Sequence, residues 1–262
     1  MSVVLLDSQV VHYEVLGRGR PLILLHGWVG SWRYWIPVMQ AASVSYRAYA
    51  IDLWGFGDSA KTPDRYSLDQ QVQLIDRFLY EMGIGRVALL GHGLGAVVAT
   101  LYALRNPEIV DRVMSVSYPL DETRVSARLR SMNPADMADW LLGRTPLTEP
   151  VRVDAPKTDP QAISASLSGL SAAEVQQASR SLRTSCLLVN GMNDQAVIPP
   201  DLDQTLTLPE QTHAVAFEGS GHFPMLDEGS KFNRLLVDFL SLPSGESPRQ
   251  LQLKEEWKRR VR

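Results

Sequence analysis

Two side chains with acid–base chemistry stand in glycine-rich segments of the second half of the chain. Asp194 closes the segment Gly191-Met192-Asn193-Asp194, and His222 follows Gly219-Ser220-Gly221 about 28 residues later. Histidine is the side chain that exchanges a proton near neutral pH, and a single histidine in a loop is usually unremarkable. Here each segment directly follows an expected strand, and this placement favours a candidate acid–base pair.

The pentapeptide Gly91-His92-Gly93-Leu94-Gly95 lies between an expected strand and an expected helix. It resembles the nucleophile elbow G-x-S-x-G of the α/β-hydrolase superfamily, with Gly93 where that pattern has its serine. The elbow is a sharp strand-to-helix turn whose backbone is strained for any residue with a Cβ. Glycine is free of that strain, so the resemblance implies a structurally harmless residue that removes the covalent nucleophile.

Two more segments carry the same resemblance, in the order of that superfamily. His26-Gly27-Trp28, with Gly30-Ser31 beyond it, is similar to the loop whose backbone helps to form the oxyanion hole. By that resemblance the N–H groups of Trp28 and Leu94 would stabilise an oxyanion. The segment from Asp52 to Ser59 reads D-x-x-G-x-G-x-S, and its glycines suit a tight reversal with an architectural role.

The resemblance also assigns roles to the acid–base pair. Asp194 would hold the His222 ring in one tautomer, and His222 would take a proton from the nucleophile. Because Gly93 has no hydroxyl group, a water molecule would have to replace the serine, which predicts slow ester hydrolysis at most. Three other serines lie near these landmarks, none on an elbow and each with an adequate structural explanation: Ser31, Ser117 and Ser220.

Several functions therefore stay open. A hydrolase of carboxylic-ester ancestry with non-serine or vestigial activity is favoured, because the acid, the base and the oxyanion segments are all present. One alternative is a non-catalytic ligand-binding or regulatory pseudo-hydrolase. Others are a serine hydrolase recorded as an inactive Ser-to-Gly variant, and a His/Asp-based lyase or cofactor-free oxygenase.

The remaining histidines predict neither a metal site nor a cofactor. His26 is expected to pack under the oxyanion loop, and His92 fills a variable position of the elbow. No two histidines show the short spacing with a carboxylate that indicates zinc. No glycine-rich loop followed by Lys-Ser or Lys-Thr indicates a nucleotide. We therefore expect no metal and no cofactor.

Short apolar strands alternate with helices over most of the chain. Strands are expected at 3–6, 9–16, 21–25, 46–51, 86–90, 112–117, 185–189 and 214–217. Helices are expected at 32–42, 68–82, 94–104 and 231–240, with Ser67 as the N-cap of the second. Asp7-Ser8 suits an antiparallel hairpin, while the later alternation predicts a mostly parallel, doubly wound sheet of about eight strands, an α/β-hydrolase fold.

The alternation stops between 120 and 183, where prolines fall at 134, 146, 150, 156 and 160. We interpret 120–183 as an inserted helical cap, with helices around 125–142 and 170–182 and an irregular crossing loop at 145–159. The hydrolase core would then comprise 1–119 and 184–242, and a basic tail would follow at 243–262. The ligand is expected to be small, mostly apolar and ester-like. Candidate pocket residues are His26, His92, Trp54, Met132, Met137 and Trp140.

Composition bounds the partners. With 262 residues, a net charge of −3 and no broad basic footprint, the chain is not expected to bind nucleic acid. No stretch approaches the roughly 20 apolar residues of a membrane span, and no leader is recognised, so a cytoplasmic protein is expected. The lone Cys186 is expected to be buried. In the tail, Leu253, Trp257 and Val261 recur every four residues. A solvated terminal helix is the favoured interpretation, and docking of this apolar stripe on the body or on a second subunit of a homodimer is the alternative.

Overall fold

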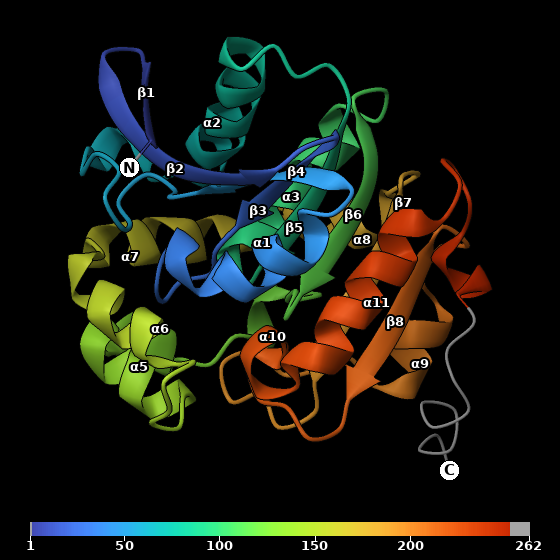
Figure 1. Ribbon diagram of the computed structural model, residues 1–262. Helices are drawn as coiled ribbons and strands as arrows, with labels where there is room; N and C mark the ends of the chain where they lie inside the picture. The colour runs from blue at the N-terminus through green and yellow to red at the C-terminus, as the bar shows by residue number, and fades with distance from the viewer. Residues whose placement is uncertain (1, 252–262) are drawn as a thin grey trace.

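One eight-stranded sheet organises the computed structural model, which describes residues 2–251 (Figure 1). The strands are β1 (Ser2–Leu6), β2 (Gln9–Gly17), β3 (Arg20–Leu25), β4 (Tyr46–Ile51), β5 (Val87–His92), β6 (Val110–Val116), β7 (Ser185–Gly191) and β8 (Thr212–Phe217). Their order is β1-β2-β4-β3-β5-β6-β7-β8, and only the pairs β1–β2 and β2–β4 are antiparallel. The predicted α/β-hydrolase fold, with its mostly parallel sheet, is confirmed.

The first two strands form the predicted hairpin. Asp7 and Ser8 connect them with positive φ angles of 48° and 64°. Two successive left-handed residues make a type I′ turn, whose twist matches that of antiparallel strands. An Asp-Ser pair can adopt it because short polar side chains tolerate this region better than others.

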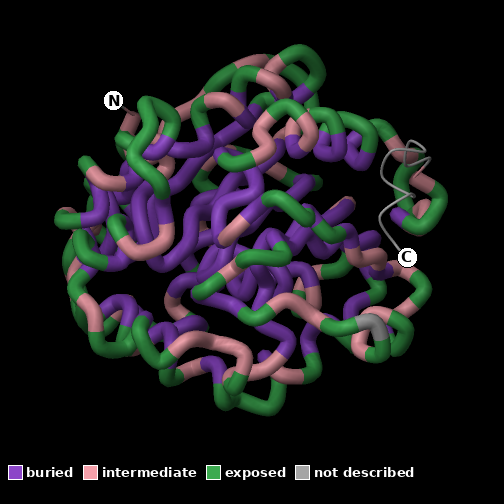
Figure 2. The backbone as a smooth tube through the Cα atoms, turned by 90° about the horizontal axis from the view of Figure 1, so that it is seen from below, coloured by how far each residue is buried: buried purple, intermediate pink, exposed green. Residues whose placement is uncertain are grey.

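Helices cover both faces of the sheet, as a doubly wound fold requires. The helices outside the β6–β7 connection are α1 (Ile36–Ala42), α2 (Leu68–Glu81), α3 (Leu94–Arg105), α9 (Leu202–Leu206), α10 (Pro224–Asp227) and α11 (Gly229–Ser241). Helices α1 and α11 pack together on one face, while α2 and α3 pack on the other (Figure 1). Every residue of β5 and β7 is buried, which explains the apolar runs at 87–90 and 186–189 within them. Figure 2 shows the buried segments gathered in the middle of the molecule.

The connection between β6 and β7 is helical, but its helices differ from the expected ones. They are α4 (Arg128–Ser131), α5 (Pro134–Leu141), α6 (Glu149–Asp154), α7 (Pro160–Ser168) and α8 (Ala173–Ser181). Pro134 begins a new helix because proline fits the first turn, so the expected helix at 125–142 is divided. The expected loop at 145–159 is wrong in part, since it contains α6. The expected helix at 170–182 corresponds to α8.

The segment after α11 folds back onto the sheet. Arg249 donates to the main-chain carbonyl groups of Leu208, Pro209 and Thr212, which precede or begin β8. The start of the expected tail is therefore anchored. The apolar repeat of Leu253, Trp257 and Val261 lies outside the described residues.

Gly95 lies in close contact with the backbone at the end of β3. A Cβ at this position would overlap the carbonyl oxygen of Leu25, because α3 begins directly against the end of β3. We expect Gly95→Ala to lower the free energy of unfolding by about 3 kcal/mol, since backbone must shift to relieve the overlap. Chemical denaturation measures the change. Gly143→Ala is the matched control, because its Cβ would meet nothing within 4 Å; equal stability of the two variants would contradict the packing argument.

Candidate active site

Asp194 and His222 form a buried hydrogen-bonded pair. They lie in the loops that follow β7 and β8, the last two strands of the sheet. Nδ1 of His222 lies 2.9 Å from Oδ2 and 3.1 Å from Oδ1 of Asp194, and both side chains are 1% exposed. Since neighbouring parallel strands end at the same edge, the strand order itself brings the two loops together.

The surroundings of Asp194 favour its ionised form. Burial alone would raise its pKa, but the charge and hydrogen bond of His222 and the N–H groups of Ala196 and Val197 lower the pKa below its usual value. Those two N–H groups donate to Oδ1 over 2.8 and 2.9 Å. A carboxylate accepts, so Nδ1 of His222 carries the proton. Nε2 is then the basic nitrogen, and it has no hydrogen-bond partner among residues 2–251.

Gly93 forms the sharp turn between β5 and α3. Its φ of 51° and ψ of −110° place it in a region that residues with a Cβ rarely adopt. Its N–H donates to the carbonyl of Val116 over 2.9 Å, and its own carbonyl accepts from Ala96 and Val97. These bonds fix a strained turn that only glycine occupies without cost.

The indole of Trp28 packs against this turn. An ideal Cβ on Gly93 would lie 3.1 and 3.2 Å from two carbons of the ring, closer than ordinary van der Waals contact. Trp28 is fully buried, and its Nε1–H donates to Oγ of Ser166 in α7 over 3.1 Å. A helix of the β6–β7 connection therefore holds the ring beside Gly93. The main-chain N–H groups of Trp28 and Leu94 have no acceptor among the described residues.

His26 and His92 are buried with both ring nitrogens engaged. His26 Nδ1 donates to the carbonyl of Gly27, and its Nε2 accepts from the N–H of Leu53 over 3.0 Å. Burial lowers the pKa of His26, which agrees with a neutral ring. His92 bonds to Tyr34 and to the main chain of His222. Both histidines are therefore held by hydrogen bonds within the fold.

The other candidate pocket residues are dispersed. Trp54 and Met137 are buried, while Met132 and Trp140 are partly buried against the core. A cavity of about 410 Å³ opens beside His222, lined by Leu141, Asn193, Gln195, Gly219, Gly221, His222 and Asp227. None of the six sequence-derived pocket candidates lines it. Asn193 and Gln195 flank Asp194 in the sequence, and Asp227 lies five residues after His222. This proximity is the signal that could have identified them.

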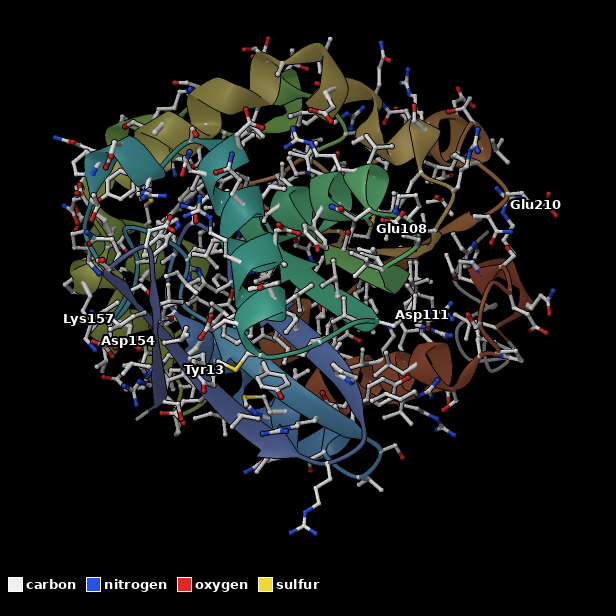
Figure 3. All side chains as sticks on the ribbon, turned by 90° about the horizontal axis from the view of Figure 1, so that it is seen from above. Tyr13, Glu108, Asp111, Asp154, Lys157 and Glu210 are labelled. Atoms are coloured by element: carbon white, nitrogen blue, oxygen red, sulfur yellow. The ribbon has the colours of Figure 1, made fainter. Side chains whose placement is uncertain are left out.

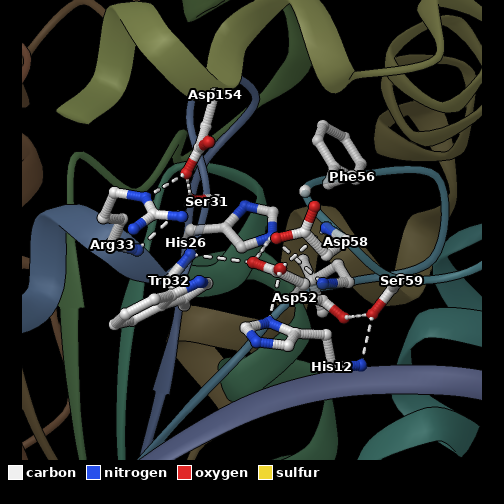
Figure 4. Close-up of polar contacts among 12 residues, drawn as sticks. His12, His26, Ser31, Trp32, Arg33, Asp52, Phe56, Asp58, Ser59 and Asp154 are labelled. Carbon is white, nitrogen blue, oxygen red and sulfur yellow. Dashed lines mark hydrogen bonds and ion pairs between the residues drawn. The ribbon is translucent and has the colours of Figure 1, made fainter. Parts of the chain in front are cut away.

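Asp52 is the centre of a second buried network (Figure 4). Its Oδ1 accepts from the N–H of Trp32 over 2.8 Å, and its Oδ2 accepts from Nδ1 of His12 and the N–H of Asp58, both over 2.9 Å. Ser59 donates to the carbonyl of Asp52 over 2.7 Å. This network ties the 52–59 loop to β2, in agreement with an architectural role. His12, Asp52 and Asp58 offer ligand atoms within 4.8 Å of one another, but these hydrogen bonds already account for their grouping.

The His12–Asp52 pair predicts a pH-dependent stability. Burial lowers the pKa of His12, but the hydrogen bond and charge of Asp52, with smaller contributions from Asp58 and Glu14, raise it above 6.5. The stabilisation that this pair contributes to the folded state is therefore complete below pH 6.5, and it is lost as the pH rises through the raised pKa of His12. We expect His12→Gln to remove this part of the pH dependence. Urea unfolding from about pH 6 to pH 9 measures it; parallel curves for both proteins would contradict the ion pair.

A buried carboxylate joins the β6–β7 connection to the core. Asp154, at the end of α6, accepts from Oγ of Ser31 and from Nε of Arg33 over 3.0 Å, and pairs with Lys157 over 3.0 Å. Asp154 and Lys157 lie side by side at the edge of the molecule (Figure 3). Lys157 also pairs with Asp58 over 2.9 Å. No local sequence pattern links residue 154 to residue 31, so this cluster was not predicted from the sequence.

No helix within residues 2–251 is long and apolar enough to cross a membrane. Among known proteins, a family model described as alpha/beta hydrolase fold matches residues 20–148 of this chain. The chain is 32% identical over 109 residues to the soluble epoxide hydrolase of Corynebacterium sp. (strain C12), covering 42% of this chain and 38% of that relative. It therefore spans well under half the length of that protein.

Other matches extend over nearly whole chains. The pimeloyl-[acyl-carrier protein] methyl ester esterase of Vibrio cholerae is 26% identical over 257 residues, covering 88% of this chain and 98% of that relative. The enol-lactonase of Burkholderia xenovorans LB400 superposes with a TM-score of 0.79 at 18% identity, covering 92% of this chain and 100% of that one. The match to the enol-lactonase shows similarity of fold alone.

Proposed function

We propose that this chain, which belongs to the α/β-hydrolase superfamily, hydrolyses small, mostly apolar carboxylic esters with water as the nucleophile and His222 as the base. The observation that carries the proposal is the Asp194–His222 pair. Its geometry leaves Nε2 of His222 as an unpartnered base beside a cavity. A general base must lie within reach of the proton that it abstracts, and the cavity gives water access to this ring.

Each residue has a defined step in this reaction. The water oxygen forms a bond to the ester carbonyl carbon while its proton moves to Nε2 of His222. Asp194 keeps the ring oriented and stabilises the imidazolium that forms. The N–H groups of Trp28 and Leu94 donate to the carbonyl oxygen as it gains negative charge. His222 then returns the proton to the leaving alcohol as the carbon–oxygen bond breaks, and the acid is released.

The helices at 120–183 serve as a cap in this proposal, over a core made of 1–119 and 184–242. Ser166 of α7 contacts Trp28, and Asp154 of α6 contacts Ser31, so both helices reach the loop after β3. The relative from Vibrio cholerae, matched over nearly its whole length, is a methyl ester esterase, which supports an ester substrate.

A second candidate is a ligand-binding relative without turnover. The position of Trp28 favours it, because the ring packs where a nucleophile side chain on residue 93 would begin. Such a protein would bind an ester or its acid and leave it unchanged.

Hydrolysis of short p-nitrophenyl esters by the purified protein tests the proposal. We expect slow, linear release of product without a burst, and no labelling by a fluorophosphonate, because no acyl-enzyme forms. Binding of an ester analogue without turnover would support the second candidate. A burst together with labelling would overturn both, since it requires a nucleophile at another position.

A further inference from the structure

A continuous chain of buried hydrogen bonds links the loop after β3 to the loop that carries His222. The N–H of Gly27 donates to Oη of Tyr34 over 2.7 Å. Oη of Tyr34 lies 2.9 Å from Nδ1 of His92, and Nε2 of His92 lies 2.8 Å from the main-chain oxygen of His222. Tyr34, His92 and His222 are each at most 2% exposed.

The proton positions in this chain follow from counting donors. The carbonyl of His222 can only accept, so Nε2 of His92 carries a proton. Burial is the largest of the effects that hold the pKa of His92 well below its usual value, so its ring is neutral and Nδ1 is bare. Tyr34 has one hydroxyl proton and already accepts from Gly27, so it donates to that bare nitrogen. The three hydrogen bonds therefore run in one direction, from the N–H of Gly27 to the main-chain carbonyl of His222.

Further contacts fix the far end. Oγ of Ser117 donates to the same His222 carbonyl over 3.2 Å, from a buried residue whose φ of 50° is rare for a side chain with a Cβ. The rings of His92 and His222 lie 4.5 Å apart, and Phe223 packs against both. Donors from the ends of two strands, β5 and β6, thus hold one carbonyl, while Asp194 holds the ring of the same residue.

We propose that Tyr34 and His92 are positioning residues that hold the loop of His222 at a fixed position relative to the oxyanion loop. The proposal rests on the proposed function, in which both loops act on one carbonyl group. Gly27 immediately precedes Trp28, whose N–H we assign to the oxyanion. Three hydrogen bonds therefore connect the residue before this N–H donor to His222, the base. Because Gly93 has no side chain to contact His222 from the elbow, the alignment of His222 depends on these bonds, on Ser117 and on Asp194.

Tyr34→Phe tests this chain of hydrogen bonds, because the substitution deletes one hydroxyl and keeps the ring that packs against His92 and Phe223. Tyr46→Phe is the matched control: Tyr46 is also buried, and its hydroxyl donates to the carbonyl of Leu240 over 2.8 Å, away from the site. Nuclear magnetic resonance of the histidine ring nitrogens in the full-length protein reports both tautomer and hydrogen bonding.

In the unmodified protein we expect His92 with its proton on Nε2. Tyr34→Phe should shift the Nδ1–H resonance of His222 and the nitrogen signals of His92, while Tyr46→Phe leaves both in place. A proton on Nδ1 of His92 would overturn the proposal. So would unchanged His222 signals in a folded Tyr34→Phe protein. These measurements need no turnover, so their outcome is separate from that of the proposed function.

The ester assay gives a second measurement of the same variants. We expect Tyr34→Phe to lower kcat by about 10- to 100-fold with little change in KM, because a displaced base costs turnover more than binding. Tyr46→Phe should retain the original kcat. Equal kcat losses in the two variants would show a general loss of stability and would overturn the positioning role.

Discussion

Gly93→Ser combined with Trp28→Leu is expected to create a covalent serine hydrolase from this chain, with kcat for p-nitrophenyl esters rising by roughly 10³-fold or more. A serine nucleophile contributes on the order of 10⁶ in comparable enzymes, and Asp194 and His222 are already paired. The second substitution is needed because the Trp28 ring lies 3.1 Å from the position of a Cβ on residue 93. We therefore expect Gly93→Ser alone to gain much less.

Fluorophosphonate labelling and burst kinetics measure this gain. The matched control is Gly93→Ala with Trp28→Leu, which adds the same Cβ and opens the same space without a hydroxyl group. Ser166 retains its hydrogen bond to the carbonyl of Ile163 in all of these variants, so α7 keeps a local partner. Labelling of the alanine control would contradict the assignment of residue 93, and so would a serine variant that folds but stays unlabelled.

His222→Ala is expected to reduce ester turnover by about 10²- to 10⁴-fold, to the level of the remaining oxyanion donors and binding contacts. Asp194→Asn should give a comparable loss, because an amide beside Nδ1 can donate to it and so favours the wrong tautomer of His222. Both effects should appear in kcat, since neither side chain is needed to bind an apolar ester.

His213→Gln is the matched control for these variants. His213 lies on β8, in the strand that leads to His222, and belongs to none of the hydrogen-bond networks of the site among the described residues. Its turnover should equal that of the unmodified protein. Retention of activity in His222→Ala would contradict the role of His222 as base and would place the hydrolytic site elsewhere on the protein.

The sequence predicted those parts of the site that depend on strand order. Asp194 and His222 meet because each follows a buried strand and because parallel neighbours end at one edge of the sheet. Gly93 was placed by the glycine pattern of the turn. The antiparallel hairpin was predicted from Asp7-Ser8, a short polar pair between two apolar runs.

Contacts that depend on how distant helices pack were not predicted. Nothing in the local sequence places Ser166 against Trp28, since they lie 138 positions apart and meet only when α7 docks on the loop after β3. The helix α7 itself had a signal, because Asp159 caps it and Pro160 begins it. Its serine-rich composition hid that signal, since serine also favours turns.

When the α4–α8 segment is exchanged between relatives, the incoming segment must keep an acidic side chain at position 154, because Asp154 bonds to residues of the core. A graft that lacks this carboxylate would leave the guanidinium of Arg33 and the hydroxyl of Ser31 without their acceptor. Ser31 is 1% exposed, and a buried hydroxyl left without its acceptor costs more than the contact itself, so a chimera would need a compensating change at position 31. One acidic side chain, Asp154, thus limits which helical segments can replace α4–α8.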